Sequence, residues 1–351
     1  MLLSDQIREC DKSNMFDILE NFGKQCEEAV QIADKYDLSK YDFTGIDNII
    51  LNGLGGSAIG GDFVRSFLQY ELPVPMFINR NYHLPAFASD KTLSIISSYS
   101  GNTEETNSAF EESLNKNCKI ICITSGGKVE QVAKDNGLPC IKIPGGLQPR
   151  CALGYSFFVV LKIMLKLKLV EDKSKEIADT VNHIKNLSKE LSDFNNKDNR
   201  PVHIARELKD KLPIIYSSVD VLDIVNLRWR GQIAENAKQL VFGNFYPEMN
   251  HNELVGWHCN KKLMKQMYVL MLEDKEDNKR IQTRMEITGS VYKEFADDHM
   301  HISSDAPSRL ERIFELAYLG DWVSYYLAIL NKVDPTPVKV IEHLKQKLSK
   351  I

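Results

Sequence analysis

The spacing of apolar positions changes along the chain. Over residues 1–45 the apolar side chains recur at intervals of three and four, which is the period of a helix packed on one face. These side chains are Ile7, Met15, Ile18, Leu19, Phe22, Cys26, Val30 and Ala33. We therefore predict a helical lead-in over residues 1–45. Beyond it, short apolar runs alternate with longer helix-like stretches.

This alternation predicts a sheet with crossover helices. The apolar runs predict strands over residues 48–51, 74–78, 92–97, 119–124 and 140–143. The stretches between and after them predict helices over residues 58–70, 103–115, 129–136 and 152–169. Strands that alternate with helices are typically parallel and joined by right-handed crossovers. Because the runs are apolar throughout, we expect a sheet covered on both faces, and hence an α/β fold.

Polar residues dominate from 171 to 199, and we place a domain boundary in this region. A second alternation then predicts strands over 212–217, 267–272 and 301–303 and helices over 223–239, 278–288 and 309–330. A basic helix over 338–350 follows. The predicted organisation is a lead-in (1–45), a first α/β domain (46–195), a second α/β domain (196–335) and a C-terminal helix (336–351).

Composition narrows the class of protein. The 351 residues are 43% hydrophobic and 26% charged, which is typical of a globular protein, and the net charge of −4 predicts no general attraction to nucleic acid. We see no run of 18 apolar residues and no signal peptide, so we expect no membrane association. Seven cysteines without a CxxC pair suggest free thiols and no zinc site. We therefore expect a cytoplasmic protein.

A glycine-rich segment, Gly53–Ser57, lies between a predicted strand and a predicted helix. Glycines allow positive φ and close backbone approach, and a helix N-terminus offers N–H groups to an anion. The segment alone is a weak signal, because a tight turn without a ligand has the same pattern. Gly53, Gly55 and Ala58 also fit a loose dinucleotide-binding pattern.

A second loop, Ser97–Thr103, makes a phosphate ligand the better interpretation. It also joins a strand to a helix, and it supplies hydroxyls at Ser98, Ser100 and Thr103. Hydroxyls and backbone N–H groups together can surround a phosphate. Asn102 or Thr103 is also expected to cap the helix. A dinucleotide-binding domain would instead place an acid after its second strand, where this chain has Asn79, Arg80 and Asn81; Arg80 leaves a phosphorylated dinucleotide conceivable.

These two loops resemble those of the sugar isomerase (SIS) domain family. More narrowly, the chain is similar to the bifunctional phosphoglucose/phosphomannose isomerases from about residue 48 to 345. Three further segments carry this narrower resemblance: 149–157 (PRCALGYSF), 230–238 (RGQIAENAK) and 247–253 (PEMNHNE). The tail from Asp334-Pro to His343-Leu-Lys also fits. The resemblance implies two SIS domains, a homodimer, a hexose 6-phosphate substrate and no cofactor.

The resemblance also implies roles for individual residues. Phosphate binding would fall to Gly56, Ser57, Ser98, Ser100 and Thr103. The catalytic group would comprise Glu235 as the base, His251 for ring opening from the neighbouring subunit, Arg150 and Lys345. The isomerase reaction requires side chains of these chemical types. One carboxylate can move a proton between C1 and C2, a neutral imidazole can open the sugar ring, and a fixed cation can stabilise an enediolate. We expect partial burial of Glu235, which would raise its pKa.

Alternatives remain at this point. A sugar-phosphate-sensing SIS module would use the loops but leave Glu235 and His251 without a role. An NAD(P)-dependent oxidoreductase would rest on the loose glycine pattern alone. The pairs His299 with His301 and His251 with His258 resemble metal ligands, but no carboxylate or cysteine spacing supports them. We therefore predict an aldose–ketose isomerase without a metal.

Overall fold

A computed structural model describes residues 3–348. The chain folds into two compact units. The first unit is Asn21–Lys185, and the second unit combines Met1–Glu20 with Asn186–Ile351. Helix α8 (Ser174–Ser192) contains the change from one unit to the other. These units describe where the chain is compact. The domain boundaries at residues 46, 196 and 336 remain a prediction.

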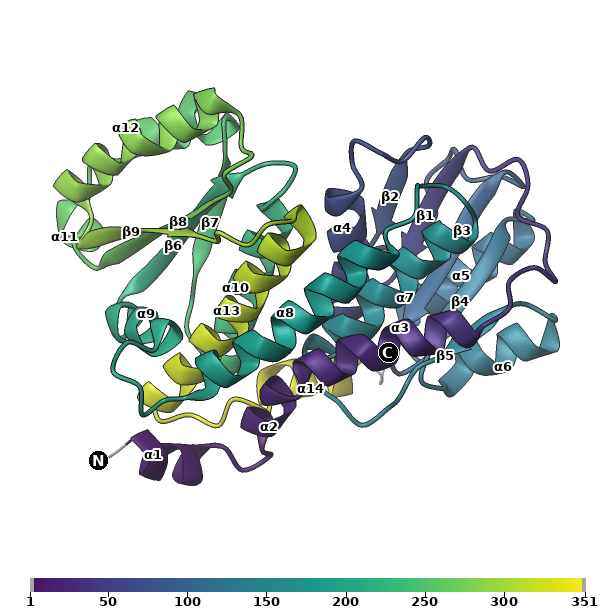
Figure 1. Cartoon of the computed structure of the whole chain (residues 1–351), viewed down its shortest axis with the longest axis horizontal. Coiled ribbons are helices and arrows are strands. Elements are labelled where there is room, and N and C mark those ends of the chain that lie inside the picture. The colour runs from purple at the N-terminus through teal and green to yellow at the C-terminus, as the bar shows by residue number, and fades with distance from the viewer. Residues whose placement is uncertain (1–2, 349–351) are drawn as a thin grey trace. The chain divides into compact units, whose positions relative to one another are not determined.

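The first unit contains a sheet of five parallel strands in the order β2-β1-β3-β4-β5 (Figure 1). The strands are β1 (Asn48–Asn52), β2 (Met76–Asn79), β3 (Thr92–Ser98), β4 (Lys119–Thr124) and β5 (Cys140–Lys142). The helices are α3 (Phe22–Lys35), α4 (Gly56–Phe67), α5 (Glu104–Asn115), α6 (Gly127–Asp135) and α7 (Leu153–Lys166), with a short 3-10 turn, η1 (Pro149–Cys151). The parallel α/β arrangement predicted from the apolar runs is confirmed.

Side chains of this sheet alternate between two covered faces. Ile50 and Ile96 face one side and form a buried cluster with Phe110 of α5 and Val129 of α6. Leu51 points to the other side, where α4 comes so close that a Cβ on Gly61 would lie 2.6 Å from a Leu51 methyl. The result is a three-layer unit in which all parallel strands end at one edge.

The second unit has four parallel strands in the order β7-β6-β8-β9. They are β6 (Leu212–Ser218), β7 (Phe242–Tyr246), β8 (Met267–Glu273) and β9 (Asp298–Ser303). The other elements are α1 (Leu3–Cys10), α2 (Met15–Glu20), α9 (Arg200–Leu208), α10 (Asp223–Ala237), α11 (Lys261–Met264), α12 (Lys279–Phe295), α13 (Arg309–Leu330), α14 (Lys339–Leu348) and the turns η2 (Glu248–His251) and η3 (Glu253–Gly256).

Helix α13 forms the core of the second unit. Within residues 3–348 it is the one helix long and apolar enough to cross a membrane, but 89% of its most apolar window is buried inside the protein. Helix α10 packs directly on it, because Gly320 leaves room for the indole of Trp229, whose Nε1 donates to the Leu316 carbonyl at 2.8 Å. Burial of this kind identifies α13 as a core helix.

Some elements were not predicted. The polar stretch 171–199 contains α8, a 19-residue helix, and α9 follows it. The apolar face of α8 is narrow and includes the buried residues Ile177, Val181 and Ile184. Most other side chains of the helix are polar or charged, so the sequence does not reveal its helical period. Strand β7 was also missed, because its sequence, FGNFY, contains Gly and Asn and lies at a sheet edge.

Candidate functional site

The two predicted phosphate loops meet at one edge of the first sheet. Strands β1 and β3 are parallel neighbours, so the segments that follow them lie side by side. The Ser97 hydroxyl donates to the Ser57 carbonyl at 3.0 Å, and the Tyr99 N–H donates to the Ser57 hydroxyl at 2.9 Å. Ser57, the last residue of the glycine segment, is therefore fixed against the serine loop.

The serine loop is held by its own hydroxyls and by a close backbone contact. The Ser98 hydroxyl donates to Thr103 Oγ1 at 3.2 Å, and the Asn102 N–H donates to the Ser100 hydroxyl at 3.3 Å. Gly101 has φ +72°, and a Cβ there would lie 1.8 Å from the Gly126 carbonyl oxygen. Only glycine fits this position, because both its conformation and the space exclude a side chain.

The prediction that a side chain of Asn102 or Thr103 caps α5 is wrong. Thr103 occupies the N-cap position, but its side chain makes no capping hydrogen bond. The Asn102 side chain instead accepts from the Lys128 N–H at 3.0 Å and joins the loop to α6. The first N–H groups of α5 are therefore not covered by these side chains, and such groups attract anions.

Arg150 lies beside the same loops. It belongs to η1 and is 6% exposed. A Cβ on Gly56 would lie 2.1 Å from the Pro149 carbonyl oxygen and 3.0 Å from the Arg150 backbone nitrogen. The structure thus brings Gly56, Ser57, Ser98, Ser100, Thr103 and Arg150 to one edge of one sheet.

Tyr99 connects the serine loop to the segment before Arg150, and sequence reasoning missed it. The Leu147 N–H donates to the Tyr99 hydroxyl at 3.0 Å, and the Tyr99 carbonyl accepts from Ser125 Oγ at 2.6 Å. Burial raises the pKa of Tyr99, so the phenol stays neutral. The sequence contains no local signal for this contact, because its partners are 48 residues apart.

The space under the loops is small. Gly56, Ser57, Ser97 and Tyr99 contribute to the wall of a cavity of about 10 Å³. A cavity of this size holds one water molecule at most. A phosphate bound here would therefore lie on the loops and not inside this cavity.

Arg80, which left a phosphorylated dinucleotide conceivable, and its neighbour Asn79 both have protein partners. Arg80 forms a hydrogen-bonded ion pair with Asp62 of α4. Asn79 is buried and donates to the Asn52 side chain at 2.9 Å. These contacts give both side chains a structural role at the end of β2.

Glu235 belongs to the second unit, on the last turns of α10. It is half-buried, as expected, and lines a groove of about 720 Å³ between α10 and the segment that leads into α14. Lys238, whose ammonium donates to the Glu235 and Pro335 carbonyls, joins the two walls. The groove has the size of a small-molecule site.

His251 is exposed at the end of η2, and its loop is anchored to the second sheet. Glu253 accepts from the Tyr216 hydroxyl of β6 at 2.5 Å and from the Asn244 side chain of β7 at 2.7 Å. Burial, together with the hydrogen bond to Glu253, raises the pKa of Tyr216. A neutral phenol thus holds the loop that carries His251.

Lys345 is exposed on α14. The beginning of α14, including Lys339, Val340 and Ile341, lines the groove beside Glu235, but Lys345 does not. The structure therefore places the segment before Lys345 near Glu235 without bringing the ammonium itself to the groove wall. Glu235, His251 and Lys345 all belong to the second unit, whereas Arg150 and the phosphate loops belong to the first.

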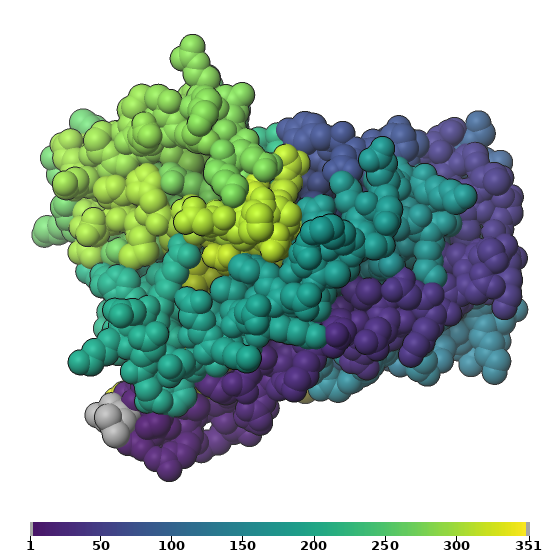
Figure 2. Space-filling view, viewed as in Figure 1, coloured from purple at the N-terminus to yellow at the C-terminus, as the bar shows by residue number. Residues whose placement is uncertain are grey.

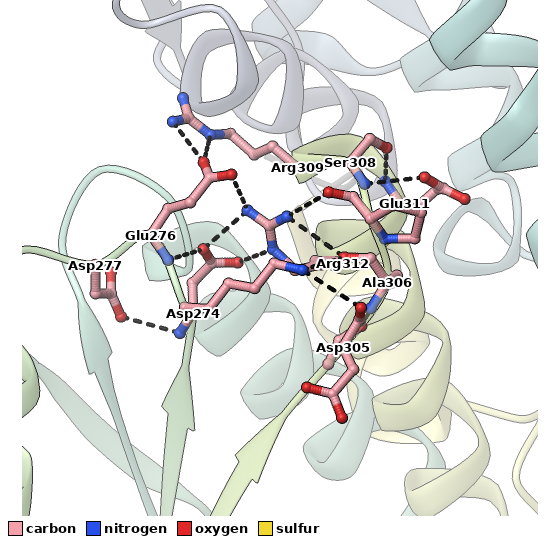
Figure 3. Close-up of polar contacts among 12 residues, drawn as sticks. Asp274, Glu276, Asp277, Asp305, Ala306, Ser308, Arg309, Glu311 and Arg312 are labelled. Atoms are coloured by element: carbon pink, nitrogen blue, oxygen red, sulfur yellow. Dashed lines mark hydrogen bonds and ion pairs between the residues drawn. The ribbon is translucent and has the colours of Figure 1, made fainter.

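In the second sheet, the strand that corresponds to β3 is not followed by a serine loop. Strands β6 and β8 occupy the sheet positions that β1 and β3 occupy in the first sheet. After β8, residues 274–278 read Asp-Lys-Glu-Asp-Asn. Arg312 pairs with two carboxylates of this loop, with Nε 2.7 Å from Asp274 Oδ2 and Nη2 2.8 Å from Glu276 Oε1 (Figure 3). An acidic loop closed by a buried arginine does not suit a phosphate.

Comparisons with known proteins agree with this description. Residues 197–348 match the family model for the bacterial phosphoglucose isomerase C-terminal SIS domain. The bifunctional phosphoglucose/phosphomannose isomerase of Caldicellulosiruptor bescii is 42% identical over 96% of this chain and 99% of its own length. The Aquifex aeolicus enzyme of the same name is 35% identical over 90% of this chain and 94% of its own length.

Solved structures share the fold. A putative phosphosugar isomerase from Clostridium difficile 630 superposes with a TM-score of 0.73 at 15% identity, covering 94% of this chain and 97% of its own. That identity supports the fold alone. The similarity to the curated relatives goes further, because it extends over nearly the full length of both chains. The chain therefore belongs to the SIS-domain family of bifunctional phosphoglucose/phosphomannose isomerases.

Proposed function

We propose that this protein interconverts glucose 6-phosphate, and also mannose 6-phosphate, with fructose 6-phosphate through a cis-enediol. The observation that carries the proposal is the contact of Gly56 with Pro149 and Arg150. It supports the proposal because the backbone that carries Arg150 lies against the start of α4, beside two loops suited to a phosphate, in a chain of this family. The relatives' names supply the substrate class.

The loops would hold the substrate by its phosphate. Ser57, Ser98, Ser100 and Thr103 offer hydroxyls, and the N-termini of α4 and α5 offer backbone N–H groups. These donors carry no full charge, so their strength depends on being fixed in place. The hydrogen bonds that join Ser57 to Ser97 and Tyr99 supply that fixation.

Glu235 would remove the proton from one carbon and return it to the neighbouring one. Its half-buried position suits a carboxylate that must act as a base and then as an acid. Arg150 would stabilise the negative charge of the enediolate, and its burial makes the interaction stronger than in water. Both C2 epimers form when the intermediate is protonated on either face.

His251 would open the sugar ring as a neutral imidazole that moves a proton from the anomeric hydroxyl to the ring oxygen. Its exposure fits a residue that serves the neighbouring subunit of a homodimer. Lys345 would be a further cation of the site. No cofactor is required by this chemistry, and we infer a cytoplasmic location.

A sugar-phosphate sensor would bind the same ligands without turnover. A coupled assay that oxidises glucose 6-phosphate formed from fructose 6-phosphate separates the two functions, and a second assay for mannose 6-phosphate extends the test. Both are run with a chelator present. We expect turnover of both aldoses that survives chelation. Binding of fructose 6-phosphate without turnover would contradict the proposal and favour the sensor.

A further inference from the structure

Two histidines on the edge strand of the second sheet form a pair that the isomerase chemistry does not use. His299 and His301 are two residues apart on β9, so their side chains share one face of the sheet. Their ring centroids lie 5.6 Å apart. Their side chains are 18% and 40% exposed, so solvent reaches the pair.

Both rings direct the same nitrogen toward one point on α12. A Cβ built on Gly289 would lie 3.3 Å from His299 Nε2 and 3.6 Å from His301 Nε2. A glycine at this helix position therefore leaves a space bordered by two imidazole nitrogens. Figure 2 shows α12 on the outer surface of its unit, and Gly289 is buried on the face of α12 that is turned toward β9.

A carboxylate contacts the Nδ1 side of the His301 ring, a pairing that the spacing of the sequence did not reveal. Glu273, the last residue of β8, lies with Oε1 2.6 Å from His301 Nδ1. A neutral His301 that donates from Nδ1 to Glu273 carries its lone pair on Nε2. Metal-binding histidines almost always donate their second N–H in this way. His299 Nδ1 is buried and has no hydrogen-bond partner within residues 3–348.

We propose that His299 and His301 bind one divalent transition-metal ion of the class that prefers imidazole, namely Ni²⁺, Cu²⁺ or Zn²⁺. With metal–nitrogen bonds of about 2.1 Å, two rings on one tetrahedral ion would have centroids roughly 5 Å apart, close to the observed separation. Within residues 3–348 no three His, Cys, Asp or Glu side chains are grouped to hold a metal. The pair therefore supplies two ligands, and water supplies the rest.

Calorimetric titration of the full chain, without a histidine tag, with Ni²⁺ at about pH 7.5 tests the proposal, because the imidazoles must be deprotonated to bind. We expect one ion per chain. His299→Asn and His301→Asn should each weaken binding at least about tenfold, and Glu273→Gln by about tenfold or more. The double histidine variant should show no saturable binding.

Two variants separate metal binding from folding. Gly289→Ala keeps both histidines and improves helix propensity, but its methyl group fills the space between the rings, so it should weaken binding while the melting temperature holds. His83→Asn is the matched control, because His83 also pairs with a carboxylate (Glu112, 2.5 Å); we expect no change in affinity. Unchanged affinity in the double histidine variant, or no binding by the original chain, would overturn the proposal.

Discussion

Gly56 and Pro149 approach so closely that a Cβ at residue 56 would lie 2.1 Å from the Pro149 carbonyl oxygen. Gly56 is the first residue of α4, and Pro149 precedes Arg150. The start of α4 and the segment that carries Arg150 are therefore fitted to one another through the backbone. Any side chain at residue 56 must push the two segments apart.

Gly56→Ala should therefore impair both stability and turnover. Overpacking of this kind costs about 1–3 kcal/mol of unfolding free energy. We expect kcat/KM to fall at least about tenfold, because Arg150 and the loops no longer fit one substrate. Urea unfolding and the coupled assay measure the two effects. Gly145→Ala is the control, since its Cβ would meet nothing closer than Ser125 Oγ at 3.5 Å. Equal behaviour of the two variants would count against this role for Gly56.

Tyr99→Phe should lower both stability and activity by a modest amount. It keeps the ring and removes the acceptor of the Leu147 N–H, a loss of about 1 kcal/mol for one hydrogen bond. The segment before Arg150 should become less ordered, and kcat/KM should drop about fivefold. Steady-state kinetics measure the change. A variant with unaltered kcat/KM would show that the Tyr99–Leu147 contact does not position Arg150.

Arg312→Met should destabilise the second unit strongly. Arg312 and Asp274 are both 0% exposed, so the substitution leaves a buried carboxylate without its partner. Breaking such a pair costs about 3–5 kcal/mol. Urea unfolding should show this loss. The double variant Arg312→Met with Asp274→Leu should recover part of it, whereas a single variant within about 1 kcal/mol of the original would contradict the account.

Asp277 should make stability depend on pH in an unusual direction. Burial, together with the charges of Asp274 and Glu273, raises the pKa of Asp277. A raised folded-state pKa means that the group stabilises the fold below its unfolded value of about 3.9, and that this contribution is lost as pH rises toward the folded value.

Asp277→Asn removes the titrating carboxyl, and with it the loss of stability at higher pH. The amide can still contact Ser218 Oγ and the Asp274 N–H. The melting temperature of the variant should exceed that of the original chain at about pH 7, and the difference should shrink as pH falls toward about 4. Comparing the two chains at each pH cancels the titration of other carboxylates. A difference that grows on acidification would contradict the assigned direction.

Part of the fold followed from local pattern. The predicted strand 119–124 and the helix 309–330 have the bounds of β4 and α13, because continuous apolar runs mark buried elements. The polar surface of α8 concealed its apolar face, and the Gly and Asn residues of β7 interrupt its apolar pattern.

Residue types in the phosphate loops could be predicted, but their fit could not. Serines and glycines between a strand and a helix indicate an anion site from sequence alone. The approach of Gly56 to Pro149 and the hydrogen bond between Tyr99 and Leu147 join segments far apart in the chain. Such contacts depend on the packed fold. The pairing of Glu273 with His301 is of the same kind, because it joins neighbouring strands.

In the proposed reaction, the Glu235 carboxylate transfers a proton between C1 and C2 of a hexose 6-phosphate. Proton NMR of fructose 6-phosphate in D₂O measures this, since an enediol route carries deuterium into the product. We expect deuterium in the aldose phosphates formed by the original chain, and a rate at least about 100-fold lower for Glu235→Gln. Glu207→Gln, at another half-buried helix glutamate, should keep the original rate. A Glu235→Gln variant that exchanges and isomerises at the original rate would contradict the account.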